Sequence, residues 1–224
     1  MGTRLTNGRV QKYFDKHAAG YDEQIGVFER RVLGRHREWA TGQASGQVLE
    51  LAVGTGLNLP SYPPSVDHVL GIELSPKMLQ LAHARITNSD LDDRIDVRLG
   101  DVQQLDVGDA TIDTVLSTYT LCTIPDADAA LREARRVLRP GGRLIVVEHG
   151  PSSRLLARAG QRLINPVSVR FQADNLLRDP LPLVRSAGFD VVSVDRAGRW
   201  GIVHRVVAVK PSAVGEAKAG APAK

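Results

Sequence analysis

A glycine-spaced turn follows an apolar run in the first quarter of the chain. Residues 49–56 read LELAVGTG, so Gly54 and Gly56 stand two residues apart at the end of that run. Glycines there let backbone N–H groups approach a ligand without interference from a Cβ atom. Glu73 ends the next apolar run, where a carboxylate can accept both hydroxyls of a ribose. These residues predict a nucleotide site, and a dinucleotide is disfavoured because G-x-G-x-x-G lacks its third glycine here.

A second group of residues, near the N-terminus, could move a proton. Tyr13 and His17 are four residues apart, so they share one face of a helix, and Tyr21 follows after small residues. A histidine titrates near neutrality and can accept a proton. We therefore expect His17, with Tyr13 or Tyr21, to deprotonate or orient an acceptor molecule. The alternative is a surface histidine beside Lys16.

The remaining cysteine and histidines are not spaced as metal ligands, so we predict no metal. Cys122 is the single cysteine, which excludes an intramolecular disulfide, and no histidine stands beside it in the sequence. We expect it to pack as a small apolar residue. His36, His68 and His83 are expected at the surface, and His204 is expected to be structural.

The elements that must position these residues alternate along the chain. Short apolar runs typical of strands cover residues 47–53, 68–74, 94–100, 111–118, 143–149, 189–196 and 201–210. Amphipathic segments typical of helices cover residues 8–41, 76–86, 127–138, 153–164 and 182–189. Strands that alternate with helices indicate an α/β fold with a mostly parallel sheet, and right-handed crossovers place helices on both of its faces.

The same pattern predicts three parts of the chain. We expect an N-terminal helical lid over residues 1–45, in which Gly20 separates two helices. A core follows over residues 46–210. The Ala- and Gly-rich stretch 211–224 is expected to be a disordered tail.

Composition indicates a soluble protein of one hydrophobic core. The 224 residues are 42% hydrophobic and 24% charged, and no apolar run approaches the roughly 20 residues of a transmembrane helix. No secretory signal opens the sequence, so we expect a cytoplasmic location. The net charge is +4, but acidic residues are interleaved with basic ones and only 4% of residues are aromatic. We therefore expect no nucleic-acid partner.

One basic stripe stands out against this mixed surface. Arg154, Arg158 and Arg162 recur every four residues along the predicted helix 153–164. The stripe leaves three partners open: an anionic substrate, peripheral contact with a membrane, or water alone.

Five segments taken in order resemble the successive motifs of class I S-adenosylmethionine-dependent methyltransferases: VLELAVGTG, GIELSPKML, GDVQQL, TIDTVLSTYTLCTIPD and RRVLRPGGRLIVVEHG. They are most similar to the branch that contains ubiquinone/menaquinone, phospholipid N- and small-molecule methyltransferases, and the resemblance runs from about residue 10 to 210. It implies a Rossmann-like seven-stranded sheet and S-adenosylmethionine as cofactor. Ala52 stands where many members have the first glycine of the turn. Alanine is a mild change there if the backbone has a negative φ, and on that basis we expect cofactor binding to be kept.

The resemblance also implies roles for individual residues. Glu73 would hold the ribose hydroxyls, Asp101 the adenine amino group and Thr118 the methionine amino group. The full set of implied cofactor-binding residues is Tyr21, Glu50, Ala52, Gly54, Gly56, Glu73, Leu74, Met78, Asp101, Val102 and Thr118. Tyr119 and His149 are expected to contact the substrate.

Methyl transfer from a sulfonium needs alignment and exclusion of water rather than a metal. We expect a small acceptor that is aromatic or heteroaromatic, such as an indole, methylated on carbon or nitrogen with proton removal by His17 or Tyr21. The alternative is a phospholipid N- or quinone C-methyltransferase, which the basic helix and the resemblance both favour. A cofactor-binding module without catalysis is a further alternative. A nucleic-acid methyltransferase is disfavoured because no Asn-Pro-Pro-Tyr motif is present.

Overall fold

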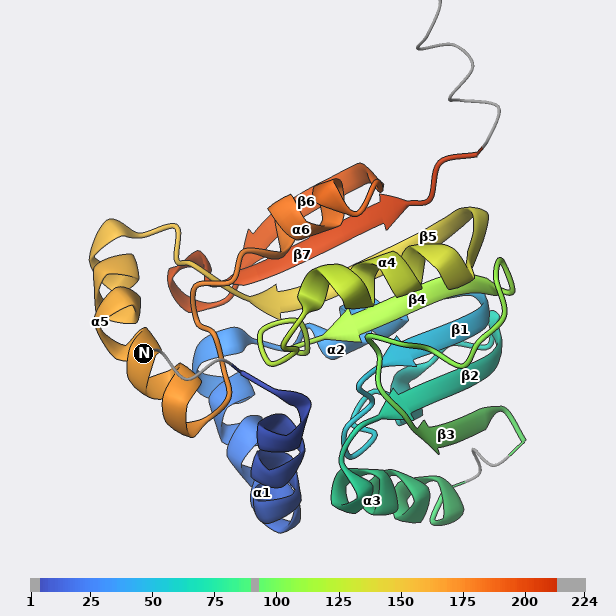
Figure 1. Cartoon of the computed structure of the whole chain (residues 1–224), viewed down its shortest axis with the longest axis horizontal. Coiled ribbons are helices and arrows are strands. Elements are labelled where there is room, and N and C mark those ends of the chain that lie inside the picture. Colours follow the sequence, from blue (N-terminus) through green and yellow to red (C-terminus); the bar gives the residue numbers. More distant parts are fainter. Residues whose placement is uncertain (1–4, 90–92, 213–224) are drawn as a thin grey trace, which may run out of the picture.

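The computed structural model describes residues 5–89 and 93–212, and within them one sheet carries the fold (Figure 1). Its seven strands lie in the order β3-β2-β1-β4-β5-β7-β6. They are β1 (Gly46–Leu51), β2 (Val66–Glu73), β3 (Ile95–Leu99), β4 (Ile112–Thr118), β5 (Leu138–His149), β6 (Asp190–Ala197) and β7 (Val203–Val209). The pairs from β3 to β5 are parallel, and β7 runs antiparallel to both β5 and β6. The predicted mostly parallel sheet is therefore confirmed.

Six α-helices surround this sheet in the described residues. They are α1 (Asn7–Phe28), α2 (Arg37–Thr41), α3 (Pro76–Thr87), α4 (Ala127–Val137), α5 (Leu155–Phe171) and α6 (Pro180–Ser186). Side-chain caps fix three of the starts. Ser75 accepts a hydrogen bond from the backbone N–H of Met78 at α3, Asp126 from that of Ala129 at α4, and Asp179 from that of Leu181 at α6.

Helices cover both faces of the sheet because alternate strand residues point to opposite sides. Leu49 and Leu51 of β1 belong to a buried cluster with α4 and α6. Val48 of β1 points to the opposite face of the sheet and belongs to a second cluster, which includes Ala40 of α2 and Ala82 of α3. The two clusters form the core and confirm the predicted layers.

The strand order reverses between β1 and β4. The chain passes outward from β1 to β2 and β3, and then returns to place β4 on the other side of β1. In an open α/β sheet, a crevice forms at the carboxyl ends of the strands at such a switch point. The loops after β1, β2 and β4 therefore define the place for a ligand.

The N-terminal helix differs from the expectation in one respect. Gly20 does not separate two helices, because α1 runs unbroken from Asn7 to Phe28. The helix passes through a π-helical turn, Glu29–Leu33, and the break comes at Gly34, whose φ is +94°. A glycine inside a helix costs only about 1 kcal/mol, and contacts along α1 outweigh that cost. Asp22 of α1 accepts hydrogen bonds from Thr55 Oγ1 and Arg85.

Some predicted boundaries stay untested. The division into a lid over residues 1–45 and a core over residues 46–210 remains a prediction, and residues 213–224 of the expected tail lie outside the described residues. Among the described residues, no helix combines the length and apolar character needed to cross a bilayer.

Candidate active site

A cavity lies at the carboxyl ends of β1, β2 and β4, with α1 along one side. Eleven of the residues predicted to bind cofactor or substrate line it, namely Tyr21, Glu50, Ala52, Gly54, Glu73, Leu74, Met78, Asp101, Val102, Thr118 and Tyr119. Gly56, Tyr13, His17 and His149 are not part of its lining. The strand-end motifs thus meet in one place, as the sheet topology requires.

The glycine turn after β1 has two distinct glycines. Gly54 has a φ of +60° and lines the cavity, and its N–H donates to Oε2 of Glu73 at 2.9 Å. Gly56 has a φ of +80°, and a Cβ there would lie 2.7 Å from Cδ1 of Leu59. Gly56 is therefore needed for the shape and packing of the turn.

Ala52 does not have the backbone conformation that we expected. Its φ is +50°, in the left-handed region, whereas the expectation was a negative φ. The left-handed conformation brings Cβ close to the following carbonyl oxygen and is strained for any residue with a side chain. Ala52 lines the cavity, so this strain is stored at the site itself.

Two carboxylates can hold the sugar and the base of an adenosyl group. Both oxygens of Glu73 accept one backbone hydrogen bond each, from Gly54 and from Ser75. A carboxylate offers about four acceptor positions, so Glu73 keeps capacity to accept from a ribose hydroxyl. Burial raises the pKa of Glu73, and the hydrogen bonds from the backbone act against that rise. Asp101 accepts from Asn7 of α1 at 2.6 Å, which brings the start of α1 to the side of the cavity that Asp101 lines.

A buried polar cluster closes the opposite end of the cavity. Glu50 accepts from Asn58 and from the hydroxyl of Tyr62, each at 2.7 Å. Thr118 accepts from Asn58 at 2.9 Å and from Arg37 at 3.1 Å. Burial raises the pKa of Glu50 to about 7, against the opposing effect of its two hydrogen bonds and of Arg37.

Arg37 also lines the cavity, and no motif in the sequence predicts it there. Its guanidinium lines the cavity, its side chain is only 15% exposed, and it pairs with Glu29 at 2.7 Å. It also lies 5.2 Å from the ring centre of Tyr119. A buried guanidinium at the mouth of a cavity is suited to bind a carboxylate such as that of methionine. No spacing in the sequence marks Arg37, because it reaches the site only through the turn at Gly34.

Aromatic residues and an unpaired hydroxyl mark the space beside this cluster. Tyr119 has a φ of +55°, and its buried hydroxyl has no hydrogen-bond partner within the described part of the chain. A buried hydroxyl without a partner is costly, so a bound molecule is the expected partner. Tyr21 lines the same space, and burial raises the pKa of its hydroxyl to about 12. With Phe14, these rings give the cavity an aromatic wall.

His17 and Tyr13 lie on α1 and outside the cavity lining. Their ring centres are 4.3 Å apart, and Nδ1 of His17 lies 2.7 Å from the carbonyl oxygen of Tyr13. Burial raises the pKa of Tyr13, and the charge of Asp174 adds to that rise. The role of His17 as a base stays a prediction.

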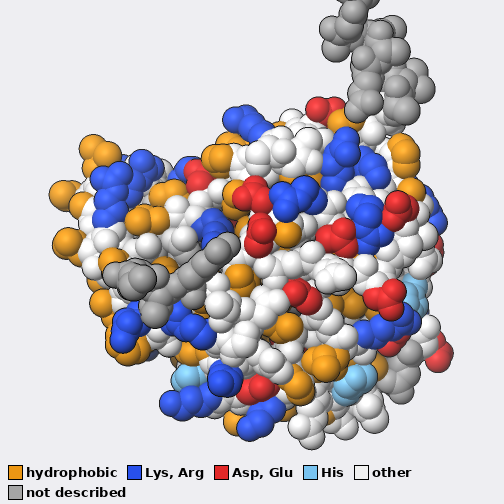
Figure 2. Space-filling view, viewed as in Figure 1, with side chains coloured by type: hydrophobic (Ala, Val, Ile, Leu, Met, Phe, Trp, Pro, Cys, Tyr) orange, Lys and Arg blue, Asp and Glu red, His pale blue; other side chains and the backbone are white. Residues whose placement is uncertain are grey.

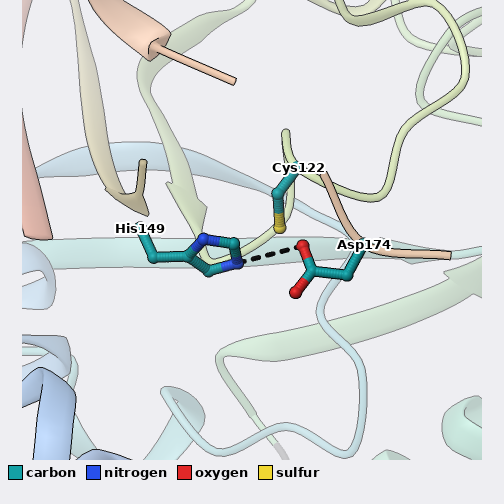
Figure 3. Close-up of side chains that lie close together, drawn as sticks. All are labelled: Cys122, His149 and Asp174. Atoms are coloured by element: carbon teal, nitrogen blue, oxygen red, sulfur yellow. Dashed lines mark ion pairs between the residues drawn. The ribbon is translucent and has the colours of Figure 1, made fainter. Parts of the chain in front are cut away.

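Three residues from separate segments meet beside the loop that follows β4 (Figure 3). Nε2 of His149 lies 3.1 Å from Oδ1 of Asp174, and the sulfur of Cys122 completes a group whose polar atoms lie within 4.8 Å of one another. Cys122 has no histidine beside it in the sequence, but the fold brings His149 close to it. His149 comes from the end of β5 and Asp174 from the segment after α5.

The charges in this group favour a proton-transfer pair. Burial lowers the pKa of His149, but Asp174 and Glu148 raise the pKa by more than burial lowers it, so the net shift is upward. Burial and the charges of Asp174 and Glu148 raise the pKa of the Cys122 thiol. A protonated thiol is a poor metal ligand, since metals bind the thiolate. The group could nevertheless present three ligand atoms to one cation.

Comparisons with known proteins agree with this geometry. Residues 49–146 match a family model described as a methyltransferase domain. A demethylmenaquinone methyltransferase from Lactiplantibacillus plantarum is 33% identical over 168 residues, which cover 70% of this chain and 67% of that protein. A phosphatidylethanolamine N-methyltransferase from Cereibacter sphaeroides is 38% identical over 104 residues, 46% of this chain and 51% of that protein. The chain thus spans between half and two thirds of these relatives.

A solved structure supports the fold. An S-adenosylmethionine-dependent methyltransferase from Thermotoga maritima superposes with a TM-score of 0.68 and 23% identity, over 89% of this chain and 99% of that one. At that identity the likeness concerns the fold alone.

Proposed function

The chain belongs to the S-adenosylmethionine-dependent methyltransferases, and from that premise we propose that it methylates an aromatic acceptor that carries an ionisable O–H or N–H group. S-Adenosylmethionine supplies an electrophilic methyl group on a sulfonium. Glu73 and Asp101 would hold its ribose and adenine. Arg37 and Thr118 would hold its methionine end. The hydroxyl of Tyr119, which has no partner in the described part of the chain, is free to bind a ligand in the same cavity.

The contact between His149 and Asp174 carries the proposal for the acceptor. In this proposal the Asp174 carboxylate, 3.1 Å from Nε2 of His149, favours a proton on that nitrogen, which leaves Nδ1 to accept a proton from an acceptor that extends past the cavity lining to His149. Removal of that proton makes a phenol, quinol or indole more nucleophilic at oxygen, nitrogen or ring carbon. Aromatic side chains of Phe14, Tyr21 and Tyr119 favour a planar acceptor. Both the indole-type acceptor predicted from the sequence and a quinol fall in this class.

His17 remains the second candidate for the base. Its Nδ1 is engaged by the carbonyl oxygen of Tyr13, so Nε2 would have to accept the proton. His149 is favoured because a carboxylate orients its ring, as the base of a catalytic pair requires. His149→Gln should lower kcat by about 10²- to 10⁴-fold with unchanged cofactor affinity, whereas His17→Ala should retain most of the turnover. The opposite result would assign the base to His17 and would restore the prediction from the sequence.

A phospholipid amine is the second candidate acceptor, because the Cereibacter sphaeroides relative is named for phosphatidylethanolamine. The experiment is a comparison of three probes with S-adenosylmethionine: indole, a reduced demethylmenaquinone with a short prenyl chain, and phosphatidylethanolamine vesicles. Methylated product is measured by mass spectrometry. Product from either aromatic probe supports the proposal, and product from phosphatidylethanolamine alone overturns it. Failure to bind S-adenosylmethionine in calorimetry would instead favour the cofactor-binding module without catalysis.

A further inference from the structure

Helix α5 stands apart from the rest of the fold (Figure 1). The helix spans Leu155–Phe171, and of its 17 residues only Ser168 is buried. The apolar side chains on it face solvent instead of the core. Leu156 is 90% exposed and Leu163 is 81% exposed. An ordinary surface helix buries its apolar stripe against the protein, so the stripe of α5 lacks a partner within the described residues.

The exposed apolar residues form one surface. Leu156, Leu163, Val167 and Phe171 are spaced by seven, four and four residues, a spacing that places them on one side of a helix. Leu155 and Ile164 extend this surface, and both are also exposed. Figure 2 shows hydrophobic and basic side chains together at the edge of the molecule where α5 lies. We call these six residues the α5 apolar face.

The charge of this segment has a single sign. No acidic residue occurs from Gly150 to Ala173, whereas Arg154, Arg158, Arg162 and Arg170 all fall within it. Elsewhere in the chain, acidic and basic residues are interleaved. An apolar face combined with arginines and without acids is the pattern of a helix that lies in the interface of an anionic membrane.

We propose that the α5 apolar face docks onto an anionic phospholipid membrane. Its leucines and Phe171 enter the boundary between headgroups and acyl chains, and the arginines contact lipid phosphates. A second copy of the chain is a poorer occupant. A two-fold contact between α5 helices would bring together two segments that carry arginines and no acidic residue, so neither would supply the other with an anionic partner. Docking goes beyond the proposed function, because it does not depend on which acceptor is methylated.

The connections of α5 place such a membrane beside the candidate active site. Gln161 of α5 donates to the carbonyl oxygen of Gly150, which follows His149, at 2.9 Å. Asn165 accepts from the N–H of Leu176, close to Asp174, at 2.8 Å. Arg9 of α1 donates to the carbonyl oxygen of Arg170 at 2.7 Å. The helix is therefore tied to both segments of the histidine–aspartate pair and to α1.

Co-sedimentation with vesicles tests the proposal. The full chain is mixed with vesicles of phosphatidylcholine alone, or with vesicles of phosphatidylcholine that contain roughly 30% phosphatidylglycerol. We expect binding to the anionic vesicles that weakens as salt rises, and much weaker binding to phosphatidylcholine. Leu156→Ser combined with Leu163→Ser should lower the partition coefficient by at least about tenfold. Arg162→Glu should lower it as well, and by less in high salt.

Matched variants separate this surface from a general effect. Leu99 and Val192 are also exposed, but they lie on strands β3 and β6. Leu99→Ser with Val192→Ser should leave the partition unchanged, and so should Arg132→Glu on α4. Equal partition of the α5 variants and the wild type, or no binding to anionic vesicles, would overturn the proposal. So would sedimentation velocity in which the α5 variants convert a dimer to a monomer, because a second copy would then be the occupant. Calorimetry with S-adenosylmethionine on the same variants tests the proposed function separately.

Discussion

Nε2 of His149 lies 3.1 Å from Oδ1 of Asp174, and this contact joins the end of β5 to the segment after α5. Burial alone would lower the pKa of His149, yet Asp174 and Glu148 raise it above its ordinary value near 6.5. A histidine acts as a base only when it is neutral. We therefore predict that kcat/KM rises with pH and that its midpoint lies above about 6.5.

Asp174→Asn should shift this midpoint to lower pH, because it removes the negative charge that stabilises the protonated imidazole. The pH profile of kcat/KM between about pH 5 and 9 measures the shift. A second pair provides the control, since Nδ1 of His204 lies 3.4 Å from Oδ1 of Asp179. Asp179→Asn should leave the midpoint in place, because Asp179 contacts His204 and not His149. The helix should be kept as well, because asparagine can still cap α6. An identical midpoint in Asp174→Asn and wild type would show that this pair does not set the profile.

A second prediction concerns Arg37, which we propose to hold the methionine end of the cofactor. Arg37→Gln should weaken S-adenosylmethionine binding by about 10- to 100-fold, because a hydrogen bond to a charged group contributes about 1.5–3 kcal/mol. Decarboxylated S-adenosylmethionine lacks the carboxylate that Arg37 would bind. The wild type should therefore prefer S-adenosylmethionine over this analogue, and Arg37→Gln should lose the preference. Calorimetry with both compounds measures it.

Glu29, whose carboxylate pairs with the guanidinium of Arg37, provides the control for Arg37. Glu29 accepts from Nε of Arg37 at 2.7 Å, so Glu29→Gln weakens that pair but keeps the guanidinium. It should retain the preference for S-adenosylmethionine. Thermal unfolding checks that the variants are folded. A preference that survives in folded Arg37→Gln would place the carboxylate elsewhere.

Much of the cavity lining could be predicted from the sequence because its residues stand at strand ends. Glu73 and Thr118 are the last residues of β2 and β4, and Gly54 and Asp101 follow β1 and β3, so the parallel strands bring all four to one edge of the sheet. The layers of the fold follow from the same alternation of strands and helices. Local spacing is sufficient here, since each motif carries both the element and the site residue.

The group formed by His149, Asp174 and Cys122 could not be predicted in the same way. Asp174 follows a helix with an exposed apolar face, and only the folded chain brings it to His149 and Cys122. Arg37 reaches the cavity after the turn at Gly34, where the chain has left α1. These positions depend on contacts between segments distant in the sequence. The length of α5 was also underestimated, because its helix continues through Pro166 to Phe171.

A third prediction follows from the backbone of Ala52. With a φ of +50°, Ala52→Gly should relieve strain of about 1–2 kcal/mol. The greater freedom of glycine in the unfolded chain offsets about 0.4–1 kcal/mol of that gain. The free energy of unfolding should therefore rise by roughly 0.5–1 kcal/mol, which urea denaturation can measure.

Ala110 provides a matched control for Ala52. It has a φ of +52° and lies in an exposed turn between β3 and β4, away from the cavity. Ala110→Gly should stabilise the protein similarly and leave cofactor affinity unchanged. Loss of stability in Ala52→Gly would mean that the methyl group of Ala52 contributes packing that exceeds the strain.

The last prediction concerns the buried carboxyl of Glu50, whose pKa is raised from 4.5 to about 7 mainly by burial. The folded protein thus binds this proton more tightly than the unfolded chain, so its contribution to stability is complete below about pH 4.5 and is lost as pH rises through about 7. In the absence of cofactor, the stability of the wild type relative to Glu50→Gln should fall by roughly 2–3 kcal/mol between about pH 4.5 and 8. Urea denaturation at several pH values measures this difference. Glu23→Gln, at an exposed position on α1, should give a profile parallel to that of the wild type. A parallel profile for Glu50→Gln would mean that Glu50 is ionised in the folded protein, with its charge balanced by Arg37.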